Sequence, residues 1–479
     1  MAAPKVAHPA LEERRKGGKR LRKETPLASH EKWKPAADRP DPIALLEEQN
    51  TRREPDLVPV RHGRMMVSPF TFYRGAARIM AADLKDTPRA GLVVQLCGDA
   101  HLSNFGLFAS PERTLLFDLN DFDETLPGPF EYDVKRMTAS FTIAALNNEF
   151  RKSEVRGATQ AAARAYREAM AEFAQMRLMD VWYAHLSEDD IMAAIKHLEA
   201  TQKTKAQRAA IMRGEQSAMA IGLKAHTHDS LQALSKLGEL VDGKYRIVSQ
   251  PPIVVPLRDL DAASYGLSPD EIEKAIREEF RAYRATLQHD RRRLLERFEL
   301  VDLARKVVGV GSVGTRAFIA LLQGRNQDDP LFLQVKEATA SVLEDHLPRS
   351  RFAQPGQRVV EGQRMMQAAS DIYLGWTKGI QAGRYLYWRQ LRDMKGSAVV
   401  EAMTPMGLEF YAGICGWTLA RAHARSGDPA AIAAYLGKSD AFDAAITDFS
   451  LRYADQNERD YEAFAKAVRS GRLAAVEGV

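Results

Sequence analysis

The sequence predicts an α+β protein in which long helical regions alternate with groups of short strands. Residues 132–240 are rich in Ala, Met, Leu and Arg and contain no proline, which is typical of helices. The chain from Pro405 onward has a similar composition. Short apolar runs bounded by glycine or turn residues lie within 91–119 and 306–336, and such runs predict buried strands.

In chain order, organised structure is expected to begin near Arg64 and to pass through a turn into a helix over Phe70–Leu84. Gly91–Cys97 is a short apolar run that starts at a glycine, so it predicts a buried strand. Two further apolar runs, Phe105–Phe108 and Thr114–Leu119, are separated by a five-residue connection that contains a proline. This spacing predicts a hairpin.

The pattern changes again after the long helical region. Lys244–Leu257 contains strand-like residues, and Asp270 to Lys306 is expected to be helical, with Ser268-Pro269 as its start. The remaining expected elements are strands and turns from Lys306 to Lys336, a helix over Arg358–Asp371, a strand over Tyr385–Met394 and helices from Pro405 to the end.

The composition is that of an ordinary globular protein. Hydrophobic residues make up 45% and charged residues 27% of the 479 residues, and no run of 18 or more apolar residues predicts a membrane span. The basic N-terminus is not followed by the apolar segment of a signal peptide. Cys97 and Cys415 cannot form a disulfide framework or a zinc cluster. We therefore expect a cytoplasmic protein with no membrane association and no obligate protein partner.

The positive charge is concentrated at the N-terminus. Residues 1–40 contain eleven Lys or Arg and five acidic residues, whereas the net charge of the whole chain is +5. The rest of the chain has no basic excess, so nucleic-acid binding is not expected beyond this arm. Several prolines follow the basic residues, and residues 1–60 are therefore predicted to be a basic disordered tail and linker.

The segment Cys97-Gly98-Asp99-Ala100-His101-Leu102-Ser103-Asn104 follows the first predicted strand. In phosphoryl transfer, an Asp in such a loop orients the acceptor hydroxyl and takes its proton, and an Asn further along helps to bind Mg²⁺ on the nucleotide. Asp99 is therefore the candidate catalytic base, and Asn104 is a candidate metal ligand. The alternative is a polar turn, because Asp-x-x-x-x-Asn also occurs by chance.

An acidic segment, Asp118-Leu119-Asn120-Asp121-Phe122-Asp123-Glu124, ends the predicted hairpin. Carboxylates grouped beside an Asn-bearing loop provide the hard oxygen ligands that Mg²⁺ prefers. Asp118, Asp121 and Asp123 are therefore candidate metal ligands. The alternative is a solvated acidic turn, but the two apolar residues within the segment indicate that it is partly buried.

Gly309, Gly311 and Gly314 form a G-x-G-x-x-G loop that also contains Ser312. Backbone amides of such a loop can approach phosphates closely. A dinucleotide-binding fold runs from this loop into a helix, whereas a kinase runs into a second strand and then a third strand that bears a lysine. Here a strand-like segment ending at Lys336 follows, so Lys336 is the candidate ligand of the α- and β-phosphates.

A carboxylate is expected to pair with Lys336. Glu361 lies in the next predicted helix and is the first choice, with Glu344 second. Glu337 is adjacent to Lys336, but alternation along a strand would direct it to the opposite face. The alternative is that Glu361 is an ordinary exposed helix glutamate.

These motifs resemble the catalytic half of aminoglycoside phosphotransferases and related small-molecule kinases. Gly98-Asp99 through Asn104, then Asp121, then Gly128-Pro129 and Tyr132-Asp133 match the pattern His-Gly-Asp-x-x-x-x-Asn, Ile-Asp-Trp, Gly-Asp-Pro and Tyr-Asp-Leu of that group. Cys97 stands where the group has His, so the usual role of that residue is filled differently or lost.

From about Arg64 onward, the chain is similar to the bacterial family called domain of unknown function 2252. The segments that carry this likeness are Phe72–Gly75, Gly98–His101, Asn120–Glu124 and Gly309–Gly314. The resemblance implies a relation to the protein-kinase-like fold. In the phosphotransferase pattern, the spacing from the loop Asn to the metal-binding Asp fits Asp118 slightly better than Asp121, so both carboxylates stay candidates for the main metal ligand.

The order of the motifs departs from that of kinases. A kinase has its Gly-rich loop and Lys before the catalytic Asp, whereas here Asp99 comes long before Lys336 in the chain. The resemblance therefore implies a two-lobed kinase-like fold that is circularly permuted. The expected division is a tail and linker (1–60), a catalytic-lobe-like region with a helical insert (61–300), a nucleotide-binding lobe (301–397) and helices that return to the catalytic lobe (398–479).

The function that this resemblance implies is ATP- and Mg²⁺-dependent phosphoryl transfer to a hydroxyl of a small molecule. Two alternatives stay open. The same fold could transfer AMP in place of a phosphoryl group, or the chain could be a pseudokinase that binds nucleotide or a partner as a regulatory protein. A nicotinamide-dependent oxidoreductase is a more distant alternative.

Overall fold

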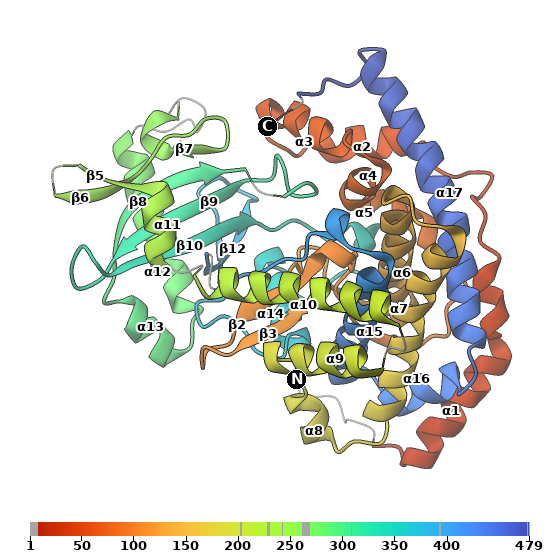
Figure 1. Ribbon diagram of the computed structural model, residues 1–479. Helices are drawn as coiled ribbons and strands as arrows, with labels where there is room; N and C mark the ends of the chain where they lie inside the picture. Colours follow the sequence, from red (N-terminus) through yellow and green to blue (C-terminus); the bar gives the residue numbers. More distant parts are fainter. Residues whose placement is uncertain are drawn as a thin grey trace.

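The computed structural model describes residues 8–201, 204–227, 230–241, 243–260, 269–307, 309–391, 394–476 and 478. A six-stranded sheet lies on the left of Figure 1 and a larger helical part lies on the right. The helix α14 (Pro355–Met366) packs against the sheet and also against α15 (Pro405–Ser426), so it bridges the two parts. The mixed α+β character predicted from the sequence is confirmed.

The chain enters the helical part through a series of short helices. These are α1 (Leu11–Glu24), the 3₁₀ turn η1 (Leu27–Glu31), α2 (Pro42–Asn50), the 3₁₀ turn η2 (Pro55–Leu57), α3 (Val58–Met65), α4 (Pro69–Gly75) and α5 (Ala77–Leu84). Proline stands in the first turn of several of them, where its missing N–H costs no helical hydrogen bond. Ser68 caps α4, because its hydroxyl accepts from the Thr71 amide.

The prediction that residues 1–60 are a disordered tail is wrong for the residues from 8 onward. The helix α1 packs against α16 (Pro429–Leu436), and Gly18 lies so close to the Ala431 carbonyl that a larger residue would clash. Arg39 forms ion pairs with Asp83 and Asp460, each at 2.6 Å. This segment is rich in charged residues, so its local sequence pattern does not indicate a buried face. The residues that cover that face lie far away in the sequence.

Four short strands come next and form two antiparallel pairs. β1 (Val93–Leu96) pairs with β4 (Leu126–Pro129), and β2 (Phe105–Ala109) pairs with β3 (Leu115–Leu119). The predicted strand and hairpin are thereby confirmed. The 3₁₀ turn η3 (Leu102–Asn104) lies between β1 and β2 in sequence. Helix α6 (Phe130–Asn147) begins directly after β4 and is buried along most of its length.

The long helical region contains α6 and a further group of helices. These are α7 (Lys152–Phe173), α8 (Leu178–Tyr183), α9 (Glu188–Thr201), α10 (Lys205–His226) and α11 (Ser230–Leu237). The chain then forms the hairpin of β5 (Gly238–Val241) and β6 (Lys244–Ile247), followed by β7 (Val254–Pro256), the 3₁₀ turn η4 (Leu257–Asp259), α12 (Pro269–Ala285) and α13 (His289–Leu295).

The large sheet is antiparallel and has the strand order β11-β12-β10-β9-β8-β7. Its remaining strands are β8 (Glu299–Lys306), β9 (Ala317–Gln323), β10 (Pro330–Glu337), β11 (Gly375–Lys378) and β12 (Tyr385–Gln390). The expectation of a helix from Asp270 to Lys306 is wrong at its end, because β8 occupies 299–306. The sheet also includes β7, so it extends beyond the expected boundaries of 301–397.

Helices cover both faces of the sheet. Along β9, Ala320 and Leu322 pack with residues of α12 and α13, whereas Ile319 and Leu321 pack with residues of α11. This alternation is the expected two-residue period of a strand that is buried on both sides. The helices α11–α13 thus belong to the sheet and not to the catalytic-lobe-like region of 61–300, where they were expected.

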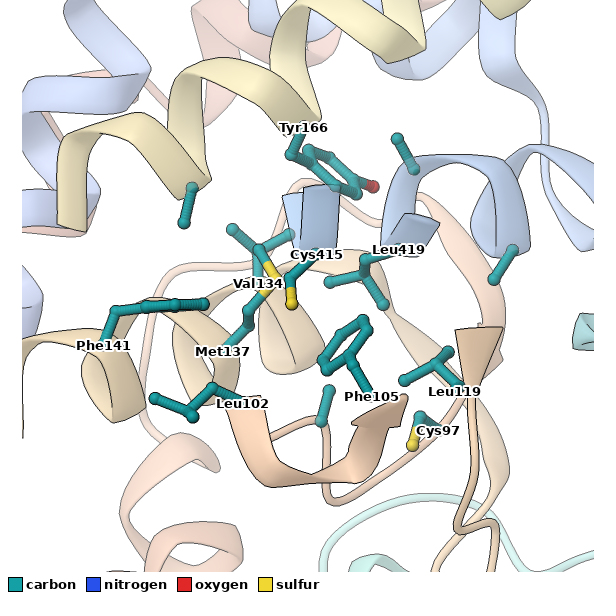
Figure 2. Packing of buried hydrophobic residues seen from close by; sticks show 14 of the residues in the cluster. Cys97, Leu102, Phe105, Leu119, Val134, Met137, Phe141, Tyr166, Cys415 and Leu419 are labelled. Carbon is teal, nitrogen blue, oxygen red and sulfur yellow. The ribbon is translucent and has the colours of Figure 1, made fainter. Parts of the chain in front are cut away.

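The largest core lies in the helical part, beneath the loop that contains Asp99. Figure 2 shows Leu102 near Met137 of α6, Cys415 of α15 beside Val134 of α6, and Cys97 next to Phe105 and Leu119. Both cysteines are buried and unpaired. α15 also lies along α7, and Thr404 and Pro405 define its first turn.

The C-terminal part ends close to the beginning of the site-bearing region. After the 3₁₀ turns η6 (Val342–Asp345) and η7 (Val400–Ala402), the chain forms α15, α16 and α17 (Ala441–Arg469). The Val476 amide donates to the Pro59 carbonyl at 2.9 Å, and the His62 ring lies 2.6 Å from the Ala474 carbonyl. Figure 1 shows the C-terminus beside α3. Among the described residues, no helix combines the length and apolar composition needed to cross a membrane.

The interface between α7 and α17 provides a test of how this core is stabilised. Arg167 binds the fully buried Asp443 at 2.8 Å, and Arg156 binds the exposed Asp448 at 2.7 Å. We expect Arg167→Met to lower the free energy of unfolding by roughly 3–5 kcal/mol, because it leaves a buried carboxylate without its cation.

The matched variant Arg156→Met changes an exposed pair on the same two helices and should cost about 1 kcal/mol or less. Urea unfolding followed by circular dichroism measures both values. Equal effects of the two substitutions would contradict the importance of the buried pair.

Candidate functional site

The loop between β1 and η3 is fixed by hydrogen bonds to its backbone. The amides of Cys97 and Gly98 donate to the two carboxylate oxygens of Asp133 at 2.6 and 2.9 Å. Gly98 has φ +85°, and a Cβ atom there would lie 2.2 Å from the Glu124 carbonyl oxygen. This position therefore requires glycine. The Asn104 side-chain amide donates to the Asp99 carbonyl at 2.7 Å, which closes the loop.

Asp99 points its carboxylate at Arg136 of α6. The Arg136 Nε lies 2.8 Å from Asp99 Oδ1, and its Nη2 donates to the Tyr73 carbonyl at 2.8 Å. Burial raises the pKa of Asp99, although the charge of Arg136 acts in the opposite direction. The His101 ring is 3.9 Å from Asp99, and burial lowers its pKa far enough to keep it neutral. Asp99 is thus a partly shielded carboxylate that retains a tendency to take up a proton.

The acidic turn after β3 meets the lysine of β10. Lys336 Nζ lies 2.6 Å from Asp123 Oδ2 and 3.5 Å from Asp121 Oδ2, although the two segments are far apart in the sequence. The Tyr387 hydroxyl donates to the other oxygen of Asp123 at 2.6 Å. The side chain of Lys336 is only 3% exposed, whereas those of Asp121 and Asp123 are 30% and 28% exposed. The two carboxylates are therefore accessible to a ligand on a side that the lysine does not cover.

The charges in this turn are unequally compensated. Burial and the neighbouring Asp123 raise the pKa of Asp121. Burial also acts on Asp123, but the charge and hydrogen bond of Lys336 and the hydrogen bond of Tyr387 lower its pKa. Burial would lower the pKa of Lys336, yet the two carboxylates raise it above its ordinary value. Lys336 is therefore charged, and Asp121 carries the less well compensated negative charge.

Asp118 does not share this accessible position. It lies within β3, is fully buried and forms an ion pair with Arg421 of α15. Its carboxylate also accepts from the backbone amides of Leu119 and Ala368, each at 2.8 Å. These hydrogen bonds leave Asp118 as a structural carboxylate that joins β3 to α15. The sequence left Asp118 and Asp121 open as the main candidate metal ligand, and the geometry favours Asp121.

The Gly-rich loop connects β8 to β9 and reaches the acidic turn. Gly309 and Gly314 have φ +66° and +84°, so both use the conformation that glycine adopts most readily. Ser312 Oγ lies 3.5 Å from Asp123 Oδ2. Because β8 and β9 are antiparallel neighbours, the loop leads into a strand, unlike the helix that follows a dinucleotide-binding loop.

The N-terminal segment holds this loop from outside. Arg53 donates to the Val313 carbonyl, and Arg64 donates to the Gly309 carbonyl. The Glu54 amide donates to the Gly314 carbonyl at 2.7 Å. Arg53 and Glu54 belong to the segment that was predicted to be a disordered tail and linker, and they contact the loop that was predicted to bind phosphates.

The expected pair of Lys336 and Glu361 is not present. Glu361 lies on α14, is about one-third exposed and binds Arg364 at 3.3 Å. The face of α14 toward the acidic turn carries Arg358, which donates to the carbonyls of Asp123 and Thr125 at 2.7 and 2.6 Å. The prediction placed the right helix beside the site but chose the wrong face, and Asp123 takes the place of Glu361 as the partner of Lys336.

The second-choice carboxylates have other partners. Glu344 lies 3.9 Å from Arg358. Glu337 binds Arg384 at 2.6 Å and Arg316 at 3.5 Å, so it faces away from Lys336 as strand alternation requires.

Sequence reasoning missed several residues that shape the site, namely Arg136, Asp133, Tyr387, Arg358, the linker residue Arg53 and Arg64. Asp133 had a signal, because it belongs to the Tyr-Asp pair noted in the resemblance. Arg136 follows it by three residues, and residues at this spacing share one face of a helix. The other residues contact the site only through long-range packing and have no local signature.

Comparison with known proteins identifies one relationship. No curated protein and no solved structure matched the chain. Residues 53–467 match the family described as an uncharacterized protein conserved in bacteria, DUF2252. This match begins at Arg53, which donates to the Gly-rich loop, and it includes both the acidic turn and Lys336. The chain belongs to the DUF2252 family.

Proposed function

We propose that this protein is an ATP- and Mg²⁺-dependent phosphotransferase that acts on a hydroxyl group of a small molecule. The observation that carries the proposal is the contact of Lys336 with Asp121 and Asp123. Phosphotransferases of the kinase type need a phosphate-binding lysine beside a metal-binding aspartate. Two motifs that are far apart in the sequence meet here with that combination of charges.

The order of elements around Lys336 supports the same proposal. β8, the Gly-rich loop, β9 and β10 follow one another, with Lys336 near the end of β10 and α14 as the next long helix. A kinase uses this succession of a Gly-rich loop, a lysine-bearing third strand and a helix. The departure is Glu361, since the kinase lysine pairs with a glutamate of that helix and Lys336 pairs with Asp123 in this structure.

We further propose that the fold is a circularly permuted form of the kinase-like fold. The hydrogen bond between Val476 and Pro59 supports this, because permutation requires neighbouring ends of the folded core. α15 also lies directly under the loop of Asp99, where Tyr411 donates to the carbonyls of Leu102 and Phe105. In this proposal α15 is the helix that precedes the catalytic loop in an unpermuted chain.

The donor atoms of the site fit Mg²⁺. Asp121 and Asp123 offer carboxylate oxygens, and the Asn104 amide nitrogen is engaged with the Asp99 carbonyl, which leaves its oxygen available as a third donor. Among the described residues there is no group of three or more His, Cys, Asp or Glu side chains that could hold a metal ion. Mg²⁺ often binds one or two carboxylates and takes its other ligands from phosphates and water.

The residues have distinct roles in this mechanism. Asp99 would orient the acceptor hydroxyl and take its proton as the new P–O bond forms and the bond to the ADP oxygen breaks. Lys336 would contact the α- and β-phosphates, and Gly309, Gly311, Ser312 and Gly314 would cover them. Bound Mg²⁺ would supply positive charge that offsets the charge of the phosphates.

Nucleotide binding tests whether Lys336 and the acidic turn form one nucleotide site. We expect wild-type protein to bind Mg-ATP in isothermal calorimetry, and Lys336→Ala and Asp121→Asn each to weaken binding by about tenfold or more, since each removes a charged contact. Lys378→Ala removes an exposed lysine from β11 of the same sheet and should leave the affinity unchanged.

Addition of EDTA should weaken ATP binding to wild type more than to Asp121→Asn. A folded wild-type protein that binds no ATP would overturn the proposed function.

Turnover tests the role of Asp99. We expect Asp99→Asn to reduce ADP formation from ATP by about 100-fold or more, because general-base catalysis contributes at least that much. Its Mg-ATP affinity should stay close to that of wild type, and the exposed-carboxylate variant Asp86→Asn should retain full turnover.

The products separate the alternatives. Release of pyrophosphate in place of ADP would indicate AMP transfer. Nucleotide binding without turnover in a screen of hydroxyl compounds would indicate a nucleotide-binding regulatory protein. Normal turnover by Asp99→Asn would show that Asp99 is not the base.

A further inference from the structure

Arg74, the penultimate residue of α4, lies between the two loops of the candidate site. Its carbonyl oxygen is so close to the Gly-rich loop that a Cβ atom on Gly311 would be 3.2 Å away. The preceding carbonyl, that of Tyr73, accepts from Arg136, and Arg136 binds Asp99. The end of α4 therefore touches the tip of the Gly-rich loop on one side and the support of Asp99 on the other.

The side chain of Arg74 has no hydrogen-bond or ion-pair partner among the described residues. Its Nε is buried without a partner, and its nearest ring contact is Phe70, 6.0 Å from the guanidinium carbon. Other arginines of the site differ from Arg74 in this respect. Arg53, Arg64 and Arg136 each donate a side-chain hydrogen bond to a protein oxygen. Arg74 is only partly buried, and Nε is its one side-chain nitrogen that is buried without a partner, so its terminal nitrogens are open to solvent and available to a ligand.

Arg74 is influenced by the charges of nearby carboxylates, but none of the described carboxylates binds it directly. Burial lowers the pKa of Arg74, whereas the charges of Glu401 and Asp99 raise it. His101 is neutral and its buried Nδ1 also lacks a partner, so it contributes no charge here. Arg136 is already engaged with Asp99, and Lys336 is engaged with the acidic turn. Within this group of described residues, Arg74 is the cation whose donors the protein does not use.

We propose that Arg74 binds the terminal phosphate of the nucleotide and stabilises the charge of that group during transfer. This inference rests on the proposed phosphotransferase function. The terminal phosphate must lie where the Gly-rich loop approaches the catalytic base, and Arg74 adjoins both. An arginine directed at the transferred phosphoryl group stabilises its negative charge well, because the planar donors of the guanidinium match the phosphate oxygens. Lys336 would serve the inner phosphates and Arg74 the outer one.

The comparison of ATP with ADP isolates this role. We expect Arg74→Ala to weaken Mg-ATP binding by about tenfold or more, since it removes a charge-assisted contact, and to change Mg-ADP binding by about twofold or less. Arg74→Lys should restore part of the preference for ATP. Arg78→Ala, which removes an arginine of α5 that pairs with Glu48 and Asp345, should leave both affinities unchanged.

The experiment also separates the two proposals. If wild type binds ATP and Arg74→Ala keeps the same ratio of ATP to ADP affinity, the role of Arg74 is overturned and the phosphotransferase proposal stands. If folded wild type binds neither nucleotide, both proposals are overturned. Thermal unfolding of each variant serves as the folding control, and because the Arg74 side chain donates no hydrogen bond within the described protein, we expect both of its variants to fold.

Discussion

The ion pair of Lys336 with the acidic turn is the interaction on which the candidate site depends. A lysine buried to this extent would tend to lose its proton, and two neighbouring carboxylates would tend to gain one. The charge of Lys336 acts against the effect of burial on Asp121 and Asp123, and the two carboxylates together offset the burial of Lys336. The sheet carries the cation and the helical part carries the anions, so the same contact that charges the site also fixes how the two parts of the molecule meet.

The helix α6 holds the loop that contains Asp99 in a similar way. Asp133 and Arg136 are three residues apart and therefore project from one face of the helix. Asp133 holds the amides of Cys97 and Gly98, and Arg136 holds the side chain of Asp99. One buried helix face thus fixes both the backbone of this loop and the position of the Asp99 carboxylate. The hydrophobic core of α6, α7 and α15 keeps that face in place. The buried charges of Asp133 and Arg136 are tolerated because each has hydrogen-bonding partners of its own.

Local patterns in the sequence were sufficient for the strand β1, the hairpin of β2 and β3 and the helix α14. They failed where the decisive partner is remote. β8 contains helix-forming residues such as Leu, Ala, Arg and Lys, and it becomes a strand because it pairs with β9. Asp118 could not be separated from Asp121 without knowledge of Arg421, which lies on the distant helix α15. Glu361 was chosen from the correct helix, but periodicity alone does not say which face meets the lysine.

The N-terminal segment illustrates the same limit and adds a functional argument. Nothing in the sequence pattern marks Arg53 or Arg64 as site residues, yet they donate to the carbonyls of Val313 and Gly309. In a planar trans peptide, the C=O and the following N–H point in opposite directions. The two arginines therefore direct the amides of Val310 and Gly314 away from the N-terminal segment. Under the proposed function, a loop held in this way would have its amides oriented before a phosphate arrives, which would lower the free-energy cost of binding. Arg53, from the predicted linker, and Arg64, from the expected start of the organised chain, thus act together on the conformation of the Gly-rich loop.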